Sequence, residues 1–417
     1  MSGLSAGFEQ QLFAEDIIMK ESVQMIHRQT VKGSTAPSPF SLEKAGEVRA
    51  FHRSFPEYAP TPLVPLQDLA ALLGVSGFYV KDESWRFGLN AFKGLGGSYG
   101  IGCCLAERLG IAPKEMTYAA LTAESVREKT GDLTFVTATD GNHGRGVAWA
   151  ASRLGYRSVV YMPKGSSPER LEHIRAQGAE ASITGLGYDD AVRFACRQAE
   201  KNEWLLVQDT AWEGYEEIPA RIMEGYTTMA LEAVEQLGDV RPTHIFLQAG
   251  VGAMAGALAG FFADYYRSDL PVISVVEPSA ADCIFRTAKA ADGALHDAEG
   301  PLNTIMAGLA CGEPCTIGWE MLDAYARNFF SVSDEVAAGG MRILGNPAGA
   351  DARIVSGESG AVTTGLAAAL LRRKELSEIR ETLGLDENAR ILCFSTEGDT
   401  DSGNYRRIVW DGIYSSL

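Results

Sequence analysis

The stretch GLNAFKGLGGSYG, Gly88 to Gly100, places one lysine, Lys93, among glycines and apolar residues. No acidic residue lies within the segment to pair with this lysine. A lysine on a solvated loop needs no such setting, whereas a lysine that must lose its proton and attack a carbonyl group does, because apolar surroundings favour the neutral amine. The segment is not a triphosphate-binding loop of the Walker type, since Phe92 precedes the lysine and Gly94 follows it. We therefore treat Lys93 as a candidate nucleophile.

The length and composition around this segment are those of a two-domain globular enzyme. The chain has 417 residues, of which 46% are hydrophobic and 22% charged, so disorder is not expected. The net charge of −17 argues against a nucleic-acid partner, because nothing in the chain would neutralise phosphates. No signal peptide is expected, because the first residues lack a basic segment followed by an apolar one.

Two further features bear on the location of the protein in the cell. Residues 245–263 are long and apolar enough to suggest a membrane span, but their glycines and alanines favour a buried strand that runs into a buried helix. Seven scattered cysteines suit a reducing cytoplasm, although a bridge such as Cys283 to Cys311 stays open. No second pair of zinc ligands follows Cys311 and Cys315, so we predict no metal site. The sequence thus predicts a cytoplasmic protein with no membrane contact.

From about residue 77 onward, short runs rich in β-branched and aromatic residues alternate with helical stretches. The runs end near residues 81, 138, 162, 209, 248, 277 and 395. Alternation of this kind predicts parallel βαβ units with both sheet faces covered, an α/β fold. Ligands bind beyond the carboxyl ends of the strands in such sheets, so the loops after the strands are the candidate sites.

The loop after the run 243–248 is AGVGAMAGAL, and it is a candidate anion site. Its glycines let backbone N–H groups approach a phosphate at a helix N-terminus, where the macrodipole favours negative charge. The loop residues are Gly250, Val251, Gly252, Ala253 and Met254. Two alternatives stay open: close helix packing by small residues, and a dinucleotide-dependent oxidoreductase that uses 245–277 and ends in Glu277. The glycine spacing misses the dinucleotide pattern by one residue.

The loop after the run 133–138 is TDGNHGRG, a candidate site for a substrate carboxylate. Its backbone donors and short polar side chains belong to Thr139, Asp140, Gly141, Asn142 and His143. The simpler interpretation is that Asn142 caps the following helix. A phosphate loop together with a nucleophilic lysine indicates pyridoxal 5'-phosphate, which requires both.

The combination resembles the fold type II pyridoxal-phosphate enzymes, the tryptophan synthase β-like group that includes serine and threonine dehydratases. The matching pieces are AFKGLGG, TDGNHGRGVAWAA, MPKGSSPERLEHIRAQGAE, AGVGAMAG and ILCFSTEGD, in the expected order over nearly the whole chain. The resemblance implies that Lys93 binds the cofactor, that Asn142 bonds its phenolic oxygen, and that Ser395, or less favourably Thr396, partners its ring nitrogen. A hydroxyl there would leave the nitrogen largely unprotonated and suit elimination over transamination.

Within that group the chain is most similar to the diaminopropionate ammonia-lyase subfamily. The pieces are WRFGLNAFKGLGGSYG, TDGNHGRG, VQDTAW, NTIMAGLACGEPC and STEGDTD. The resemblance implies elimination of 2,3-diaminopropionate, with water, to pyruvate and two molecules of ammonia. Dehydratases of the group usually carry serine where this chain has Asp140, and a carboxylate there is suited to pairing with a β-ammonium group. Asp209, which follows another strand, is a second candidate acid, or alternatively a residue that forms a turn.

The resemblance also implies an architecture, a homodimer of two-domain subunits. A smaller α/β domain, residues 94–220, would be inserted into a larger cofactor-binding domain made of residues 1–93 and 221–417, with the cofactor between them. The nearest alternative is a serine/threonine-type dehydratase of the same fold, which Asp140 argues against. A catalytically silent binding module is a third alternative, which intact Lys93, Asn142 and Ser395 argue against.

Overall fold

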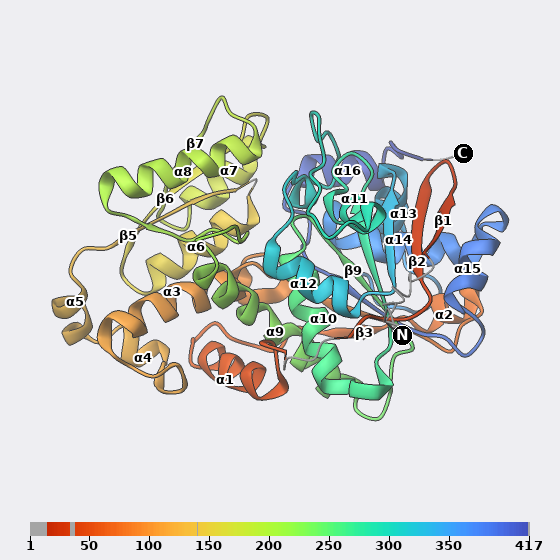
Figure 1. Ribbon diagram of the computed structural model, residues 1–417, viewed down its shortest axis with the longest axis horizontal. Helices are drawn as coiled ribbons and strands as arrows, with labels where there is room; N and C mark the ends of the chain where they lie inside the picture. Colours follow the sequence, from red (N-terminus) through yellow and green to blue (C-terminus); the bar gives the residue numbers. More distant parts are fainter. Residues whose placement is uncertain (1–14, 34–37, 140, 416–417) are drawn as a thin grey trace, which may run out of the picture.

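The strands of the chain form two separate sheets. The computed structural model describes residues 15–33, 38–139 and 141–415. Across these residues one sheet has eight strands and the other has four. In Figure 1 the four-stranded sheet and its helices lie on the left and the eight-stranded sheet lies on the right. The smaller sheet falls within 94–220 and the larger one outside it, and we propose that the two sheets mark two domains with the boundaries expected from the sequence.

The larger sheet is parallel in its centre and antiparallel at its edges. Its spatial order is β1-β2-β11-β10-β9-β12-β4-β3. Neighbours from β11 to β4 are parallel, whereas β1 with β2, β2 with β11, and β3 with β4 are antiparallel. The strands are β1 (Glu15–Met19), β2 (Val23–Arg28), β3 (Leu63–Pro65), β4 (Gly77–Asp82), β9 (His244–Gln248), β10 (Val272–Pro278), β11 (Asn328–Val332) and β12 (Arg390–Ser395). All pairings among the strands from residue 77 onward are parallel, as predicted, and the antiparallel pairs all involve β1, β2 or β3, which precede that residue.

The smaller sheet is parallel throughout, in the order β7-β6-β5-β8. Its strands are β5 (Thr134–Ala138), β6 (Arg157–Met162), β7 (Glu180–Ile183) and β8 (Leu205–Leu206). Each apolar run predicted to be a strand is one, although β8 is only two residues long. The sequence did not single out β1, β2, β3, β7 and β11, which are short, lie at or near an edge, or carry polar residues.

Helices cover both faces of each sheet. The α-helices are α1 (Leu42–Arg53), α2 (Gln67–Leu73), α3 (Gly94–Leu109), α4 (Tyr118–Leu121), α5 (Glu124–Thr130), α6 (Asn142–Arg153), α7 (Pro168–Arg175), α8 (Tyr188–Asn202), α9 (Glu217–Leu237), α10 (Ala253–Tyr266), α11 (Cys283–Ala290), α12 (Thr316–Tyr325), α13 (Asp334–Gly345), α14 (Glu358–Arg372), α15 (Ser377–Leu383) and α16 (Ser402–Val409). The 3-10 helices are η1 (Glu83–Gly88), η2 (Pro113–Glu115), η3 (Arg267–Asp269), η4 (Ala307–Leu309) and η5 (Lys374–Leu376).

Successive residues of the buried strands point into different cores, as a parallel sheet covered on both faces requires. Along β12, Leu392 and Phe394 join the core that contains α9 and α10, whereas Ile391 and Cys393 join the core that contains α13 and α14. In the smaller sheet, Val159 packs against α8, whereas Val160 packs against α6 and α7. This alternation decides which side chains at the strand ends reach the site.

The apolar segment 245–263 forms most of β9 and most of α10, so the prediction of a buried strand and a buried helix is confirmed. Within the described ranges, no helix is both long and apolar enough to cross a membrane. The apolar character of α10 follows from its position, because it packs against α9, α12 and the larger sheet.

A buried ionic cluster fixes the segment that leads into Lys93. Arg86 in η1 bonds Glu83 at 2.9 Å and Glu232 of α9 at 2.7 Å, and Lys81 of β4 bonds Glu232 at 2.8 Å. All four side chains are buried, and the two positive charges match the two negative ones. Breaking such a buried set by removing one partner typically costs about 3–5 kcal/mol. The cluster therefore ties η1 firmly to α9.

Glycines bring the backbones of α3, α6 and α9 into contact next to Lys93. A Cβ atom at Gly97 would lie 2.9 Å from the Gly146 carbonyl carbon, and one at Gly225 would lie 2.6 Å from the Leu95 oxygen. A Cβ atom at Gly146 would lie 2.8 Å from the carbonyl carbon of Lys93. The glycines around Lys93 therefore serve close helix packing, which sets the position of the lysine backbone.

We expect Gly146→Ala to destabilise the protein by about 1–3 kcal/mol, the usual cost of forcing extra atoms into a packed core. The added methyl group meets backbone atoms of α3, which cannot move aside without displacing Lys93. Gly46→Ala in α1 is the matched control, because nothing lies within 4 Å of its Cβ position. The control should be stabilising by about 0.5–1 kcal/mol. Denaturant unfolding of both variants measures the difference, and equal stabilities would contradict the packing account.

Candidate active site

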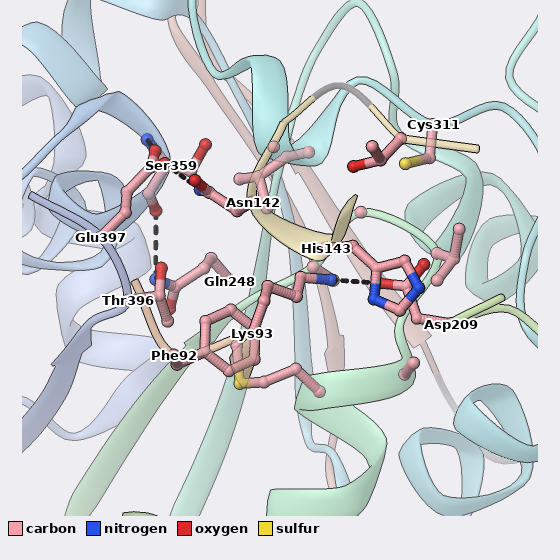
Figure 2. Close-up of a pocket in the computed structure, with 18 of the residues that line it drawn as sticks. Phe92, Lys93, Asn142, His143, Asp209, Gln248, Cys311, Ser359, Thr396 and Glu397 are labelled. Atoms are coloured by element: carbon pink, nitrogen blue, oxygen red, sulfur yellow. Dashed lines mark hydrogen bonds and ion pairs between the residues drawn. The ribbon is translucent and has the colours of Figure 1, made fainter. Parts of the chain in front are cut away.

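Loops that follow the parallel strands of both sheets meet at one cavity. The first helical residues of α6 follow β5, the loop at 209 follows β8, the glycine loop follows β9, and residues 396–397 follow β12. Lys93 enters from the N-terminal end of α3 (Figure 2). The cavity is lined by Phe92, Lys93, Thr139, Asn142, His143, Tyr188, Asp209, residues 248–254, Gly308, Leu309, Cys311, Ser359, Thr396 and Glu397.

Lys93 is paired with an acid that the local sequence does not contain. Its Nζ atom donates to Oδ2 of Asp209, which lies 116 positions further along the chain (Figure 2). The lysine side chain is 19% exposed and the aspartate side chain 5%. Nζ also lies 5.3 Å from the centre of the Phe92 ring and 5.7 Å from that of Tyr226. The aromatic rings agree with the expected apolar setting of Lys93. The expectation of an acid-free setting is wrong, because the Asp209 carboxylate pairs with the lysine.

The charge state of Asp209 is set by its neighbours. Burial raises the pKa of its carboxyl group, but the positive charges that His143 and Lys93 carry when protonated, and the hydrogen bond from Lys93, lower it more, to about 2. Burial lowers the pKa of His143, so its ring is neutral at neutral pH. Its Nε2 atom donates to the Val207 carbonyl at 2.8 Å, which leaves Nδ1 unprotonated, 3.6 Å from the Asp209 carboxylate. Lys93 is therefore the cation that keeps Asp209 ionised.

The glycine loop presents the N-terminal end of α10 to the cavity. Gly252, at φ +90°, precedes the first helical residue, and the first turn of α10 has no acidic side chain. The first N–H groups of an α-helix have no partners within the helix, so they are available to an anion. A Cβ atom at Gly250 would lie 3.2 Å from both the Leu309 Cα and the Cys311 Sγ atoms. The predicted phosphate loop thus lies in the cavity and has the backbone approach that a phosphate requires.

Asn142 links the two sheets across the cavity. Its Nδ2 atom donates to Oε2 of Glu397 at 2.5 Å, and Glu397 Oε1 accepts from the Ser359 backbone N–H at 3.1 Å (Figure 2). Asn142 is the first residue of α6 and its side chain makes no capping bond, so the alternative role as a helix cap is wrong. Its amide is positioned by an acid that the sequence analysis did not single out.

Thr396 lines the cavity, whereas Ser395 does not. Ser395 continues the face of β12 that packs against α14, and its hydroxyl bonds Ser356 at 2.8 Å. Thr396 follows on the opposite face, where its Oγ1 accepts from Gln248 Nε2 at 2.8 Å. Because neighbouring residues of a strand point to opposite sides, only one of the two can reach the cavity. The order of preference between these two hydroxyls is therefore reversed.

The other predicted residues divide as follows. Thr139, His143 and residues 250–254 line the cavity, Gly141 does not, and Asp140 lies outside the described residues. The lining residues that were not predicted from the sequence include Gln248, Ser359, Glu397 and the segment 308–311. Glu397, like Asp209, is an acidic residue in the segment that follows a strand, so the same pattern could have identified it. In the sequence it was noted only as part of the motif STEGD.

Glu358, the first residue of α14, adds a second carboxyl group beside Glu397. Burial and the charge of Glu397 raise the pKa of Glu358 from 4.5 to about 7. Its side chain accepts from the amide of Asn404 and is almost fully buried. A group with a raised folded-state pKa binds its proton more tightly in the folded state than in the unfolded state. Its contribution to stability is therefore complete below about 4.5 and is lost as the pH rises to about 7.

We expect Glu358→Gln to remove this pH dependence and to stabilise the folded protein by about 1–3 kcal/mol above pH 7. The amide keeps an oxygen that can accept from Asn404. The measurement is urea unfolding of cofactor-free protein at several pH values on both sides of the raised pKa. Glu313→Gln, at an exposed position with a 53% exposed side chain, is the control and should unfold like the parent at each pH. A parallel pH profile for Glu358→Gln and the parent would contradict the assignment.

The geometry does not support a dinucleotide site. Glu277, the acid such a site would use, is fully buried and accepts from the N–H groups of Ile284 at 2.9 Å and Phe285 at 2.6 Å. It therefore caps α11 and is not available to a ribose. In the part of the chain that the structure describes, no three histidine, cysteine, aspartate or glutamate side chains are grouped so as to bind a metal ion. All seven cysteines fall within the described residues and are reduced thiols.

The residues of the cavity fit pyridoxal phosphate. Three buried polar atoms among the lining residues, His143 Nδ1, Gln248 Oε1 and Ser359 Oγ, have no hydrogen-bond partner within the described chain. Buried polar atoms are rarely left unpaired, so such a group indicates a ligand. A primary amine, a helix N-terminus without acids and a buried hydroxyl match, respectively, the aldehyde, the phosphate and the ring nitrogen of this cofactor.

Comparison with known proteins shows the family to which the chain belongs. The chain matches the family described as pyridoxal-phosphate dependent enzyme over residues 55–385. It is 52% identical over 370 residues to the diaminopropionate ammonia-lyase of Salmonella typhimurium (strain LT2), and the match covers 88% of this chain and 92% of that enzyme. The holo diaminopropionate ammonia lyase from Escherichia coli superposes with a TM-score of 0.89 at 48% identity, covering 94% and 98% of the two chains. The same Escherichia coli enzyme in complex with an aminoacrylate-PLP azomethine reaction intermediate gives a TM-score of 0.87 at 47% identity, covering 97% and 99%.

Proposed function

This chain belongs to the pyridoxal-phosphate-dependent enzymes and, within them, to the diaminopropionate ammonia-lyases, and we propose the following assignment of its residues. The reaction is elimination of 2,3-diaminopropionate, with water, to pyruvate and two molecules of ammonia. The observation that carries the assignment is the pairing of Lys93 with Asp209 in a cavity that also contains the N-terminal end of α10. The lysine supplies the amine, and the helix end supplies the phosphate site.

The chemistry that pyridoxal phosphate supplies when bound is an electron sink for the carbanion that forms when Cα loses its proton. Lys93 would hold the aldehyde carbon of the cofactor, and the backbone N–H groups of 250–254 would hold its phosphate. Asn142, oriented by Glu397 at 2.5 Å, would bond its phenolic oxygen. Thr396 would partner the ring nitrogen from the buried wall of the cavity.

Proton transfer falls to Lys93 and to the carboxylates. The Lys93 amine would take the Cα proton after the substrate amine has replaced Lys93 on the cofactor. Asp209 stays ionised and can hold the β-ammonium group of the substrate, which must leave in protonated form. Asp140 would be a second acid on the loop that binds the substrate carboxylate, with Thr139 and His143, and this role rests on the sequence.

A spectrum and a product count test the proposal. Protein loaded with pyridoxal phosphate should show the visible absorption of the lysine-bound cofactor, and 2,3-diaminopropionate should change it. Turnover should release two molecules of ammonia for each pyruvate, whereas serine would release one. Faster turnover of serine than of diaminopropionate would favour the dehydratase alternative. A loaded protein without visible absorption would contradict the cofactor assignment itself.

The homodimer and the cytoplasmic location implied by the resemblance stay part of this proposal. Sedimentation of the purified protein tests the homodimer, because the mass of a dimer of 44.8 kDa chains is readily distinguished from that of a monomer.

A further inference from the structure

The side-chain amide of Gln248 has only one possible orientation. Gln248 ends β9, lines the cavity and is 1% exposed (Figure 2). Its Nε2 atom lies 3.1 Å from the Ser359 carbonyl oxygen and 2.9 Å from that of Phe394. Carbonyl oxygens only accept hydrogen bonds, so the NH₂ group must face them, because the reverse orientation would bring three oxygens together.

This orientation decides the direction of the neighbouring hydroxyl. Thr396 Oγ1 lies 2.8 Å from Gln248 Nε2, and an amide nitrogen donates but does not accept. The two N–H bonds of Gln248 are shared among three oxygens, of which Thr396 Oγ1 is the nearest. The threonine oxygen can only accept in this contact, so its own hydrogen points elsewhere. No other described residue accepts a hydrogen bond from this hydroxyl, and the cavity lies beside it.

We propose that Gln248 is a positioning residue that holds the Thr396 hydroxyl as a hydrogen-bond donor into the cavity, toward the ring nitrogen of the cofactor. The inference rests on the proposed function, in which pyridoxal phosphate occupies this cavity. A hydroxyl free to rotate can donate to an unprotonated nitrogen or accept from a protonated one, whereas a fixed donor bonds only the unprotonated form. Gln248 thereby selects the unprotonated ring, a weaker electron sink that suits elimination over transamination.

Nitrogen NMR of protein loaded with ring-labelled pyridoxal phosphate reports this directly. The parent protein should show the chemical shift of an unprotonated ring nitrogen at every pH at which it stays folded. Gln248→Leu frees the hydroxyl and should raise the ratio of protonated to unprotonated nitrogen at a given pH by about tenfold, the effect of one hydrogen bond. Gln248→Glu should raise it further, because a carboxylate would accept the Thr396 proton and turn the oxygen lone pairs toward the ring.

Matched variants separate positioning from a general disturbance. Thr396→Ser keeps the hydroxyl and should keep the parent shift, whereas Thr396→Val should resemble Gln248→Leu. The double variant that carries both Gln248→Leu and Thr396→Val should show no further change, because the two side chains act through one hydrogen bond. Ser395→Ala, one residue away on the other face of the strand, should leave the shift unchanged.

Three results would overturn the proposal. The first is a protonated ring nitrogen in the parent, and the second is a parent-like shift in Gln248 variants that hold the cofactor. The third applies if the Gln248 variants do not fold: a parent-like chemical shift in Thr396→Val would then overturn the proposal. A raised ratio of protonated to unprotonated ring nitrogen in Thr396→Val would support it. A parent protein that shows no visible absorption when loaded contradicts the proposed function instead, so the two failures are distinguishable.

Discussion

Replacing Lys93 with alanine is expected to lower the rate of elimination by about 10⁴-fold or more, because the variant loses both the amine that holds the cofactor and the base that takes the Cα proton. The phosphate site at the end of α10 does not involve this side chain, so the variant should still bind the cofactor weakly. Borohydride reduction of the parent should fix the cofactor to the peptide that contains Lys93, as mass spectrometry would show. The structure leaves Lys81 no such role, because it is buried in the ionic cluster with Glu232.

Lys93→Arg separates the charge of this residue from its chemistry. A guanidinium group stays protonated and can keep the pair with Asp209, but it cannot supply a neutral amine. It should therefore preserve stability better than alanine and be equally inactive. Lys201→Ala, at an exposed position near the end of α8, is the control and should behave like the parent. Label found on Lys81 or Lys164, or activity in the arginine variant, would contradict the assignment.

Asp209→Asn is expected to lower kcat/KM for 2,3-diaminopropionate by about 10²–10⁴-fold, the range associated with one acid–base group. The Asp209 carboxylate is 5% exposed, and Lys93 is its cation. Once the lysine amine is neutral, the carboxylate needs another positive group, because an unpaired buried charge is costly. The β-ammonium group of the substrate can provide it. Serine carries no charge on its β-substituent, so its kcat/KM should fall less than that of the diamine. The ratio of kcat/KM for the diamine to that for serine should therefore fall at least about tenfold.

The pH dependence of this variant provides a second check. With a pKa of about 2, Asp209 is ionised wherever the protein is active, so the loss of activity should be the same across that range. Its contribution to stability is present above about 3.8 and is lost as the pH falls through about 2. Asp132→Asn, with a side chain that is 91% exposed, is the control. Equal losses for the diamine and for serine would show that Asp209 does not recognise the β-ammonium group.

Several parts of the site were accessible from local sequence because the signals are local. Apolar runs mark strands wherever both sheet faces are covered, so β4, β5, β6, β9, β10 and β12 could be placed. The ends of those runs then identify the loops that carry Asn142 and residues 250–254. Lys93 stood out because its neighbours are small or apolar, although the glycines serve the contact of α3 with Gly146 and Gly225.

The sequence by itself determined the α/β class, the strand ends that carry the site and the identity of the candidate lysine, because each depends on residues close together in the chain. The tertiary structure alone decided the partners. The pairing of Lys93 with Asp209, and of Asn142 with Glu397, follows from strand order in two sheets. Whether Thr396 or Ser395 reaches the cavity depends on which face of β12 packs against α14. The antiparallel edges of the larger sheet are formed by β1, β2 and β3, strands that the apolar pattern of the sequence did not predict. Contacts between distant segments depend on the packing of whole elements, which no single stretch of sequence encodes.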